Sequence, residues 1–282
     1  MILVDPSCDI IRDDHTIQSS LDNIELAARI CYASTKKKEE QKSFLRGLYD
    51  NHHYRPFEFG TIYFTSSSIK ENQLFNSIVS SHWTRCIEKE STKYYTTNCR
   101  VIIESIEATS TKEENIFDIF WDIIQDIYDY HLEHRERTTI IWRIARGIAD
   151  EFRTHTQISS LMQSTRYCRY STNKFNNSIR ICRPSWMREE ESDQSHDDKV
   201  NLFVQSWTKD EEHYNKAISL GMRAEQARGL LPLDLYTEMI QCGFEEDWNR
   251  FFDQRLFDKT GKAHPDAKYI SKQAYEKNKV ND

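Results

Sequence analysis

Residues 218–255 read ISLGMRAEQARGLLPLDLYTEMIQCGFEEDWNRFFDQR. Near the end of this stretch, Trp248, Phe251 and Phe252 lie at helical spacing, which predicts an amphipathic helix. The next position on the same face is Arg255, so its guanidinium should point into the protein. Because a buried guanidinium without a partner is unstable, Arg255 should meet either an internal carboxylate or a bound anion or carbonyl-rich ligand.

Other arginines also suggest an anionic ligand. Arg228 directly precedes the apolar run GLLPL and cannot easily turn fully to solvent. Residues 135–188 contain ten arginines and one lysine, but their only acidic residues are Glu136, Asp150 and Glu151. Guanidinium groups match phosphate or carboxylate oxygens in pairs, which favours an anionic ligand of limited size. The alternative is a set of surface arginines that pair with acidic helices elsewhere.

Composition narrows the class of protein. The chain has 282 residues, of which 38% are hydrophobic, enough for a sizeable core, and a net charge of −7 that argues against coating nucleic acid. No apolar run is long enough to span a membrane, and the acidic N-terminus does not resemble a signal peptide, so we expect a cytoplasmic protein. Seven scattered cysteines without a C-x-x-C pair predict reduced thiols and no metal site.

Periodicity predicts a single α/β domain over residues 1–282. A strand is expected at residues 60–67, residues 99–105 fit either a strand or a helix, and residues 188–199 form a polar, charged insertion expected to be a loop. We recognise no internal repeat in the sequence. The predicted helices cover residues 21–34, 42–49, about 113–133, the region of 141–148, about 200–220 with Gly221 as a cap, and about 246 onward.

Four stretches together resemble the flavin-dependent thymidylate synthases. They are HHYRPFEFGTIYF (52–64), QSTRYCRYS (163–171), RICRPSW (180–186) and residues 218–255. The most specific element is S-x-R-Y at Ser164 to Tyr167, combined with A-R-x-x-L-P at Arg228 and the last-helix arginine at Arg255. The resemblance extends from about residue 24 to 265. It implies an α/β (α+β) fold with helices around a small mixed or antiparallel sheet.

The resemblance implies a homotetramer with active sites between subunits. Each site would convert dUMP to dTMP, with methylenetetrahydrofolate as carbon donor, FAD as cofactor and NADPH as reductant. Arg255 would be catalytic, because it favours ionisation of the base. The other dUMP-binding residues would be Glu151, Arg153, Ser164, Thr165, Arg166 and Arg228. The residues implied for FAD are His53, Arg55, Glu58, Thr154, His155, Thr156 and Arg250.

One departure from the family pattern affects the flavin site. The family carries Arg-His-Arg where this chain has Thr154, His155 and Thr156. Two alternatives to an active synthase therefore stay open. One is a non-catalytic nucleotide-binding homologue that has lost tight FAD binding. The other is a single-stranded nucleic-acid binder that uses the Arg and Tyr residues of the basic segment, which the overall acidity disfavours.

Overall fold

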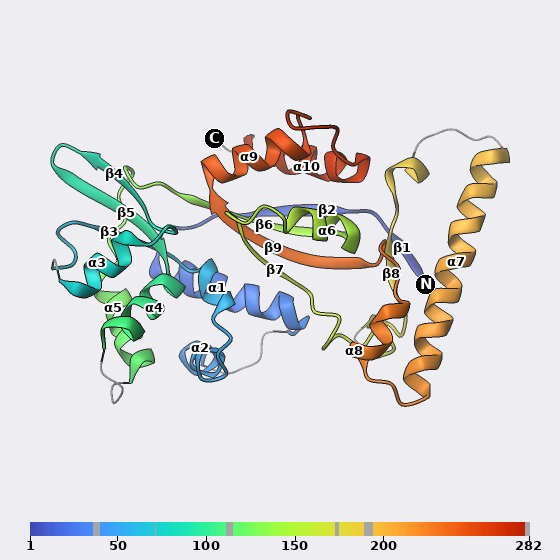
Figure 1. Cartoon of the computed structure of the whole chain (residues 1–282), viewed down its shortest axis with the longest axis horizontal. Helices are drawn as coiled ribbons and strands as arrows, with labels where there is room; N and C mark the ends of the chain where they lie inside the picture. The colour runs from blue at the N-terminus through green and yellow to red at the C-terminus, as the bar shows by residue number, and fades with distance from the viewer. Residues whose placement is uncertain (36–39, 71, 111–114, 173–174, 189–193, 280–282) are drawn as a thin grey trace.

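The computed structural model describes residues 1–35, 40–70, 72–110, 115–172, 175–188 and 194–279. These residues form a mixed α/β fold, as expected, in which helices surround three small sheets. Figure 1 shows a three-stranded sheet at one end, a four-stranded sheet in the middle and a long helix at the other end.

The four-stranded sheet is antiparallel, with the order β2-β6-β9-β7. Its strands are β2 (Ser7–Ile11), β6 (Arg137–Ala145), β9 (Tyr236–Phe244) and β7 (Ser159–Met162), and α6 (Arg146–Phe152) follows β6. Helices α9 (Glu245–Arg255) and α10 (Pro265–Lys279) lie on one side of the sheet and α1 (Ile17–Tyr32) on the other (Figure 1). Trp142 packs with Phe251 on the α9 side, whereas Ile141 packs with Ala27 on the α1 side. Side chains of β6 therefore alternate between two buried faces.

The three-stranded sheet has the order β3-β5-β4 and is also antiparallel. The elements of this part are α2 (Gln41–Asp50), the 3-10 helix η1 (Arg55–Phe59), β3 (Thr61–Thr65), α3 (Gln73–Ser80), β4 (Arg85–Lys89), β5 (Thr92–Asn98), α4 (Cys99–Thr109) and α5 (Ile116–Ile127). The side chain of Asn98 accepts a hydrogen bond from the Val101 amide, so β5 passes directly into a capped α4. Gly60 precedes β3, and a Cβ there would lie 2.7 Å from Ile24 Cδ1. Only glycine fits this close approach.

The remaining elements lie between β7 and β9, apart from β1. They are β8 (Arg180–Cys182), which pairs in parallel with β1 (Ile2–Val4), the 3-10 helix η3 (Ser185–Arg188), α7 (Gln194–Ser219), α8 (Ala224–Ala227) and the 3-10 helix η4 (Arg228–Leu230). Gly221 has a φ of 89° and its amide donates to the Ile218 carbonyl, which confirms the predicted cap. Trp207 and Tyr214 of α7 pack into a local core with Ile181 and Leu235.

Most predicted elements are confirmed, but the helix expected around residues 141–148 is wrong. Residues 137–145 are strand β6, and helix α6 begins only at Arg146. Ile140, Ile141 and Trp142 are all buried, as a strand covered on both faces requires and a helix with one buried stripe does not. The apolar positions in this region satisfied helical spacing by coincidence.

Residues 99–105, left open between strand and helix, belong to helix α4. The helix predicted over about 113–133 ends at Ile127, and residues 113–114 lie outside the described residues. The polar stretch 188–199 is not a loop throughout, because Arg188 ends η3 and residues 194–199 form the first turns of α7, while residues 189–193 lie outside the described residues. Charged residues without apolar periodicity can form a helix when one face is left exposed to water. Among the described residues, no helix has the length and apolar character needed to cross a membrane.

Candidate functional site

The guanidinium of Arg255 is held by groups that follow β6. Its Nη1 donates to Glu151 Oε2 at 2.9 Å, and its Nη2 donates to the Glu151 carbonyl at 2.9 Å and to Thr154 Oγ1 at 3.0 Å. Its Nε donates to His155 Nε2 at 3.0 Å. The side chain of Arg255 is only 17% exposed. Of the two partners considered for this arginine, the structure therefore provides the internal carboxylate.

His155 is neutral in this arrangement. Burial, followed by the positive charge of Arg255, lowers the pKa of His155 from 6.5 to about 4. Because Nε2 accepts the hydrogen bond from Arg255, the proton of the neutral ring is assigned to Nδ1. The ring also packs against Phe251, with 4.8 Å between the ring centroids. Glu151, Thr154 and His155 thus fix the orientation of Arg255, and we call these four residues the Arg255 cluster.

A second group forms around Ser164, in the loop that follows β7. The Ser164 amide donates to the Cys31 carbonyl at 2.9 Å, which ties the loop to the C-terminal end of α1. The Arg166 amide donates to Ser164 Oγ at 3.3 Å, and Arg166 Nη2 lies 3.6 Å from Glu225 Oε2 on α8. Thr165 is buried, whereas Arg166 is exposed. Arg228 begins η4 immediately after α8, the helix that carries Glu225.

Tyr32 connects this second group to His53. The Tyr32 hydroxyl and His53 Nδ1 are 2.9 Å apart, and the rings of Tyr32 and Tyr167 have centroids 5.4 Å apart. Tyr167 is 58% exposed. We call Ser164, Thr165, Arg166, Tyr167, Tyr32 and His53 the Ser164 group. It combines a residue implied for FAD with residues implied for the nucleotide.

The remaining predicted residues lie elsewhere. Glu58 is buried and accepts from Arg100 Nη1 at 2.7 Å, and Arg55 Nε lies 3.6 Å from the same carboxylate. Arg153 pairs with Asp150 at 3.2 Å on the surface. Thr156 is exposed, and Arg250 is also exposed, 4.0 Å from Asp247.

Arg228 is exposed, which corrects the expectation that it cannot turn to solvent. Of the apolar run that follows it, Leu231 packs against the core around Trp207, whereas Leu230 and Leu233 are 41% and 72% exposed. Arg228 makes no side-chain hydrogen bond or ion pair with the described residues. Its guanidinium is therefore available for an external partner.

One chain does not gather all the predicted residues into one place. The Arg255 cluster and the Ser164 group are separated by strand β7, which extends ~13 Å at the usual rise per residue. No described contact joins the two groups. Two cavities of about 810 and 870 Å³ occur among the described residues, and none of the predicted site residues lines either. The first, however, is lined by Gln163, the neighbour of Ser164.

The basic segment is largely paired within the chain. Arg143 pairs with Asp9 and Glu238, and Arg183 pairs with Asp5. Arg135 and Arg188 likewise have carboxylate partners. This supports the interpretation as surface ion pairs for most of these arginines. Arg180, which lies over the Tyr236 ring at 3.8 Å, has no ion pair among the described residues.

The sequence model of the family described as Thymidylate synthase complementing protein (Thy1) matches residues 14–141 and again residues 130–279. The chain belongs to the Thy1 family. A comparison with curated proteins found no match.

Solved structures of similar proteins include the UMP/dUMP methylase PolB from Streptomyces cacaoi. PolB bound with 5-Br UMP has 12% sequence identity and a TM-score of 0.45, and the comparison covers 98% of this chain and 90% of that chain. PolB bound with 5-Br dUMP has 13% identity and a TM-score of 0.45, with 100% and 91% covered.

Some residues of this Thy1 chain were missed by sequence reasoning. Tyr32, Arg100 and Glu225 each contact a predicted site residue, but none lies in a motif that marks it. Each comes from an element distant in sequence from its partner, so only the fold reveals the contact. Glu151 was predicted for dUMP, and it lies against Arg255 as the main carboxylate partner.

Proposed function

We propose that this Thy1 protein methylates dUMP to dTMP, with methylenetetrahydrofolate as carbon donor, NADPH as reductant and FAD as cofactor. The observation that carries the proposal is the Thy1 match, which extends over residues 14–279 and includes all the motif residues. The geometry of Arg255 supports it. Four of the five guanidinium N–H groups are used by the Arg255 cluster, which leaves one N–H of Nη1 for a ligand among the described contacts.

In this proposal Arg255 acts on the pyrimidine ring. A guanidinium held by three protein groups needs no reorientation when negative charge develops on a base carbonyl or ring nitrogen. Neutral His155 adds no second positive charge that would compete for the ligand. Glu151 fixes the arginine by one carboxylate and one carbonyl contact, and it is a positioning residue in this scheme.

The Ser164 group and Arg228 are proposed to bind the nucleotide phosphate. Ser164 supplies a hydroxyl and a loop backbone, and Arg166 and Arg228 supply guanidinium groups. The ion pair between Arg166 and Glu225 is 3.6 Å long and partly exposed, so a phosphate can displace it at low cost. Calorimetric titration of Arg228→Ala with dUMP should show about ten- to a hundredfold weaker binding. Unchanged affinity in the folded variant would remove Arg228 from the site.

A complete site requires a second copy of the chain in this proposal. No described contact joins the Arg255 cluster to the phosphate-binding residues, and in this proposal two copies each contribute one set. Exposed Leu230 and Leu233 beside Arg228 supply the apolar surface that a subunit contact buries. A homotetramer, expected from the family, satisfies this requirement. Such an arrangement places Arg228 of one copy opposite Arg255 of another.

Subunit mixing tests the shared site. Arg228→Ala and Arg255→Ala are each expected to be inactive, because each lacks one half of every site. After the two variants are mixed and allowed to exchange subunits, some sites contain both wild-type halves, and activity should return to about a quarter of wild type at full exchange. Mixing Arg228→Ala with Ser164→Ala, which alter the same half, is the matched control and should restore nothing. No recovery in the first mixture would contradict a site between copies.

FAD does not fit a site within one chain. His53 belongs to the Ser164 group, Arg55 and Glu58 to a separate network with Arg100, and Arg250 points to solvent. Thr154 and His155 are occupied by Arg255. We therefore assign no chemical step to residues around the flavin. FAD binding by this chain rests on the family resemblance and requires residues from more than one copy.

One observation favours a second candidate, the non-catalytic nucleotide-binding homologue. Thr154 replaces a family arginine and accepts a hydrogen bond from Arg255, so the position serves the arginine rather than a cofactor phosphate. A titration with FAD at low salt, followed by flavin fluorescence, separates the candidates. Bound flavin supports the synthase, and dUMP binding without flavin binding supports the homologue.

A further inference from the structure

Two parts of the chain have the same order of elements. The first, the N-terminal unit, contains β3, α3, β4, β5, α4 and α5 (residues 61–127). The second, the C-terminal unit, contains β6, α6 and β7 (residues 137–163) and then β9, α9 and α10 (residues 238–279). In both units the third strand lies between the other two and is antiparallel to them, giving β3-β5-β4 and β6-β9-β7. Residues 164–237, which include the first two residues of β9, Tyr236 and Thr237, we call the excursion.

The strand registers of the two units agree. Thr61 of β3 lies opposite Asn98, the last residue of β5, and Arg137 of β6 lies opposite Phe244, the last residue of β9. An 11-residue helix begins at the next residue in both cases, α4 in one unit and α9 in the other. The second strand also agrees, because Arg85 begins β4 opposite Thr96.

Ser159 begins β7 opposite Cys242, two residues before the end of the central strand, as Thr96 is in β5. A shared order of elements can arise independently in small folds, but agreement of both registers and of the helix start is specific. The registers place Lys89 and Thr92, the last pair of the β4–β5 hairpin, at the positions of Gln163 and Glu238. The Gln163 amide does donate to the Glu238 carbonyl, at 2.8 Å.

The units contact each other as two copies related by a two-fold axis would. Thr61 and Arg137 occupy equivalent positions, and Arg137 Nη1 donates to Thr61 Oγ1 at 3.3 Å. A contact between equivalent positions is the mark of an isologous interface. Figure 1 agrees with this arrangement, because α4 and α5 lie below their sheet while α9 and α10 lie above theirs.

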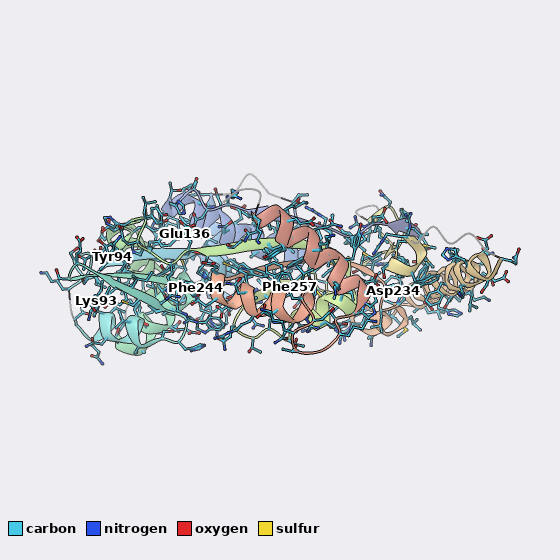
Figure 2. All side chains as sticks on the ribbon, turned by 90° about the horizontal axis from the view of Figure 1, so that it is seen from above. Lys93, Tyr94, Glu136, Asp234, Phe244 and Phe257 are labelled. Atoms are coloured by element: carbon cyan, nitrogen blue, oxygen red, sulfur yellow. The ribbon has the colours of Figure 1, made fainter. Side chains whose placement is uncertain are left out.

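The N-terminal unit lacks the residues of the proposed site. The position of Arg255, the eleventh residue of α9, is occupied in α4 by Thr109, whose hydroxyl donates to the Ser105 carbonyl of its own helix. The excursion carries Ser164 to Arg166 and Arg228, and it is replaced in the N-terminal unit by a tight turn at Glu90 and Ser91, with φ of 50° and 69°. Figure 2 shows Lys93 and Tyr94 of this hairpin at one end of the molecule, far from Asp234 near the end of the excursion.

The excursion has a core of its own. The buried residues of this core all come from residues 168–235, and they are Cys168, Tyr170, Ile179, Ile181, Trp207, Tyr214, Ala217, Ile218, Ala227 and Leu235. Met1, Leu3 and Ala33 are among the partly buried residues packed against it. A segment that buries its own apolar side chains can be carried between two strands of a sheet without being part of that sheet's core.

We infer that residues 61–127 are a second copy of the C-terminal unit that has lost its ligand site and now packs on that unit as a built-in partner. The chain therefore binds one nucleotide, through the excursion, and not two. The nucleotide part of this inference rests on the proposed function. The duplication itself rests on registers, helix starts and the contact between Thr61 and Arg137.

Binding stoichiometry of the full chain tests the inference, with dUMP titrated by calorimetry. We expect one dUMP per chain. Arg166→Ala should weaken binding at least tenfold, while Lys93→Ala, in the β4–β5 hairpin that stands in place of the excursion, should alter affinity less than twofold. Two dUMP per chain, or loss of a binding event in Lys93→Ala, would overturn the inference.

A chain that binds no dUMP would contradict the proposed function, and a second variant then decides on the duplication. In this variant Asn-Gly joins Gln163 to Glu238 in place of residues 164–237, and Met1–Val4, which pairs with β8, is removed. If the two connections are equivalent, β7 and β9 form a hairpin like β4 and β5, and the variant should unfold in one cooperative urea transition with a mixed α/β circular dichroism spectrum. An unfolded product would contradict the equivalence.

Discussion

Thr154→Arg gives the most specific test of how Arg255 is held. The family pattern suggests that an arginine at this position should help the protein, by adding a contact to the flavin. In the structure Thr154 Oγ1 instead accepts from Arg255 Nη2 at 3.0 Å and donates to the Glu151 carbonyl at 2.7 Å. An arginine side chain has no acceptor, so the substitution removes the first contact and adds a like charge.

The expected loss of stability is the sum of the lost hydrogen bond and the added charge repulsion. At this exposed position the hydrogen bond from a charged donor contributes about 1 kcal/mol to stability. Two guanidinium groups about 5 Å apart in water repel by about 1 kcal/mol. We therefore expect Thr154→Arg to lower the free energy of unfolding by about 2 kcal/mol.

Thr156→Arg is the matched control, because it introduces the same side chain two residues away. Thr156 is exposed and makes no described side-chain contact with Arg255, so its replacement should change stability by less than about 0.5 kcal/mol. Urea unfolding followed by tryptophan fluorescence measures both variants. Equal stability of the two variants would refute the role given to Thr154, and a gain in stability for Thr154→Arg would refute it more strongly.

Three further predictions concern other parts of the molecule. Between pH 6.5 and about 4 the unfolded chain binds a proton at His155 that the folded chain does not, so the free energy of unfolding should fall by roughly 1–2 kcal/mol as the pH drops through this window, after allowance for partial exposure; a His155→Gln variant with the same pH slope would contradict this. Gly60→Ala places a Cβ 2.7 Å from Ile24 and should cost about 1–3 kcal/mol in thermal unfolding, whereas Gly47→Ala in helix α2, with open space around it, should gain about 0.5–1 kcal/mol; similar melting temperatures would show that the site near Gly60 can adjust. Arg255→Lys should lower kcat for dUMP more than it raises KM, since an ammonium group cannot keep the four contacts of the guanidinium. Steady-state kinetics of this variant equal to those of the wild type would remove Arg255 from the chemistry.

Local periodicity predicted the helices with one apolar face but not the buried strand β6. Trp248, Phe251 and Phe252 correctly indicated that Arg255 points inward. Arg255 follows Phe251 by four residues, so it lies on the same buried face of the helix. Ile141 and Ile144 satisfied the same spacing within a strand. Only the pairing of β6 with both β2 and β9, which no local pattern encodes, explains their burial.

The candidate site was predictable only where the chain itself brings motif residues together. Thr154 and His155 lie directly after α6 and meet Arg255 through the packing of α6 and α9 against β6 and β9. The partner of His53 is Tyr32, and no spacing in the sequence relates the two. The internal duplication also escaped detection, since the excursion separates β7 from β9 and only the strand registers relate the two units.

The measurement that tests the account most directly is product formation. The purified protein is incubated with dUMP, methylenetetrahydrofolate, NADPH and FAD, and pyrimidine nucleotides are separated by liquid chromatography with mass detection. We expect dTMP in the complete mixture, none when the folate or FAD is omitted, and none with Arg255→Ala. A folded wild-type protein that binds dUMP but forms no dTMP would contradict the proposed activity and leave the non-catalytic nucleotide-binding homologue.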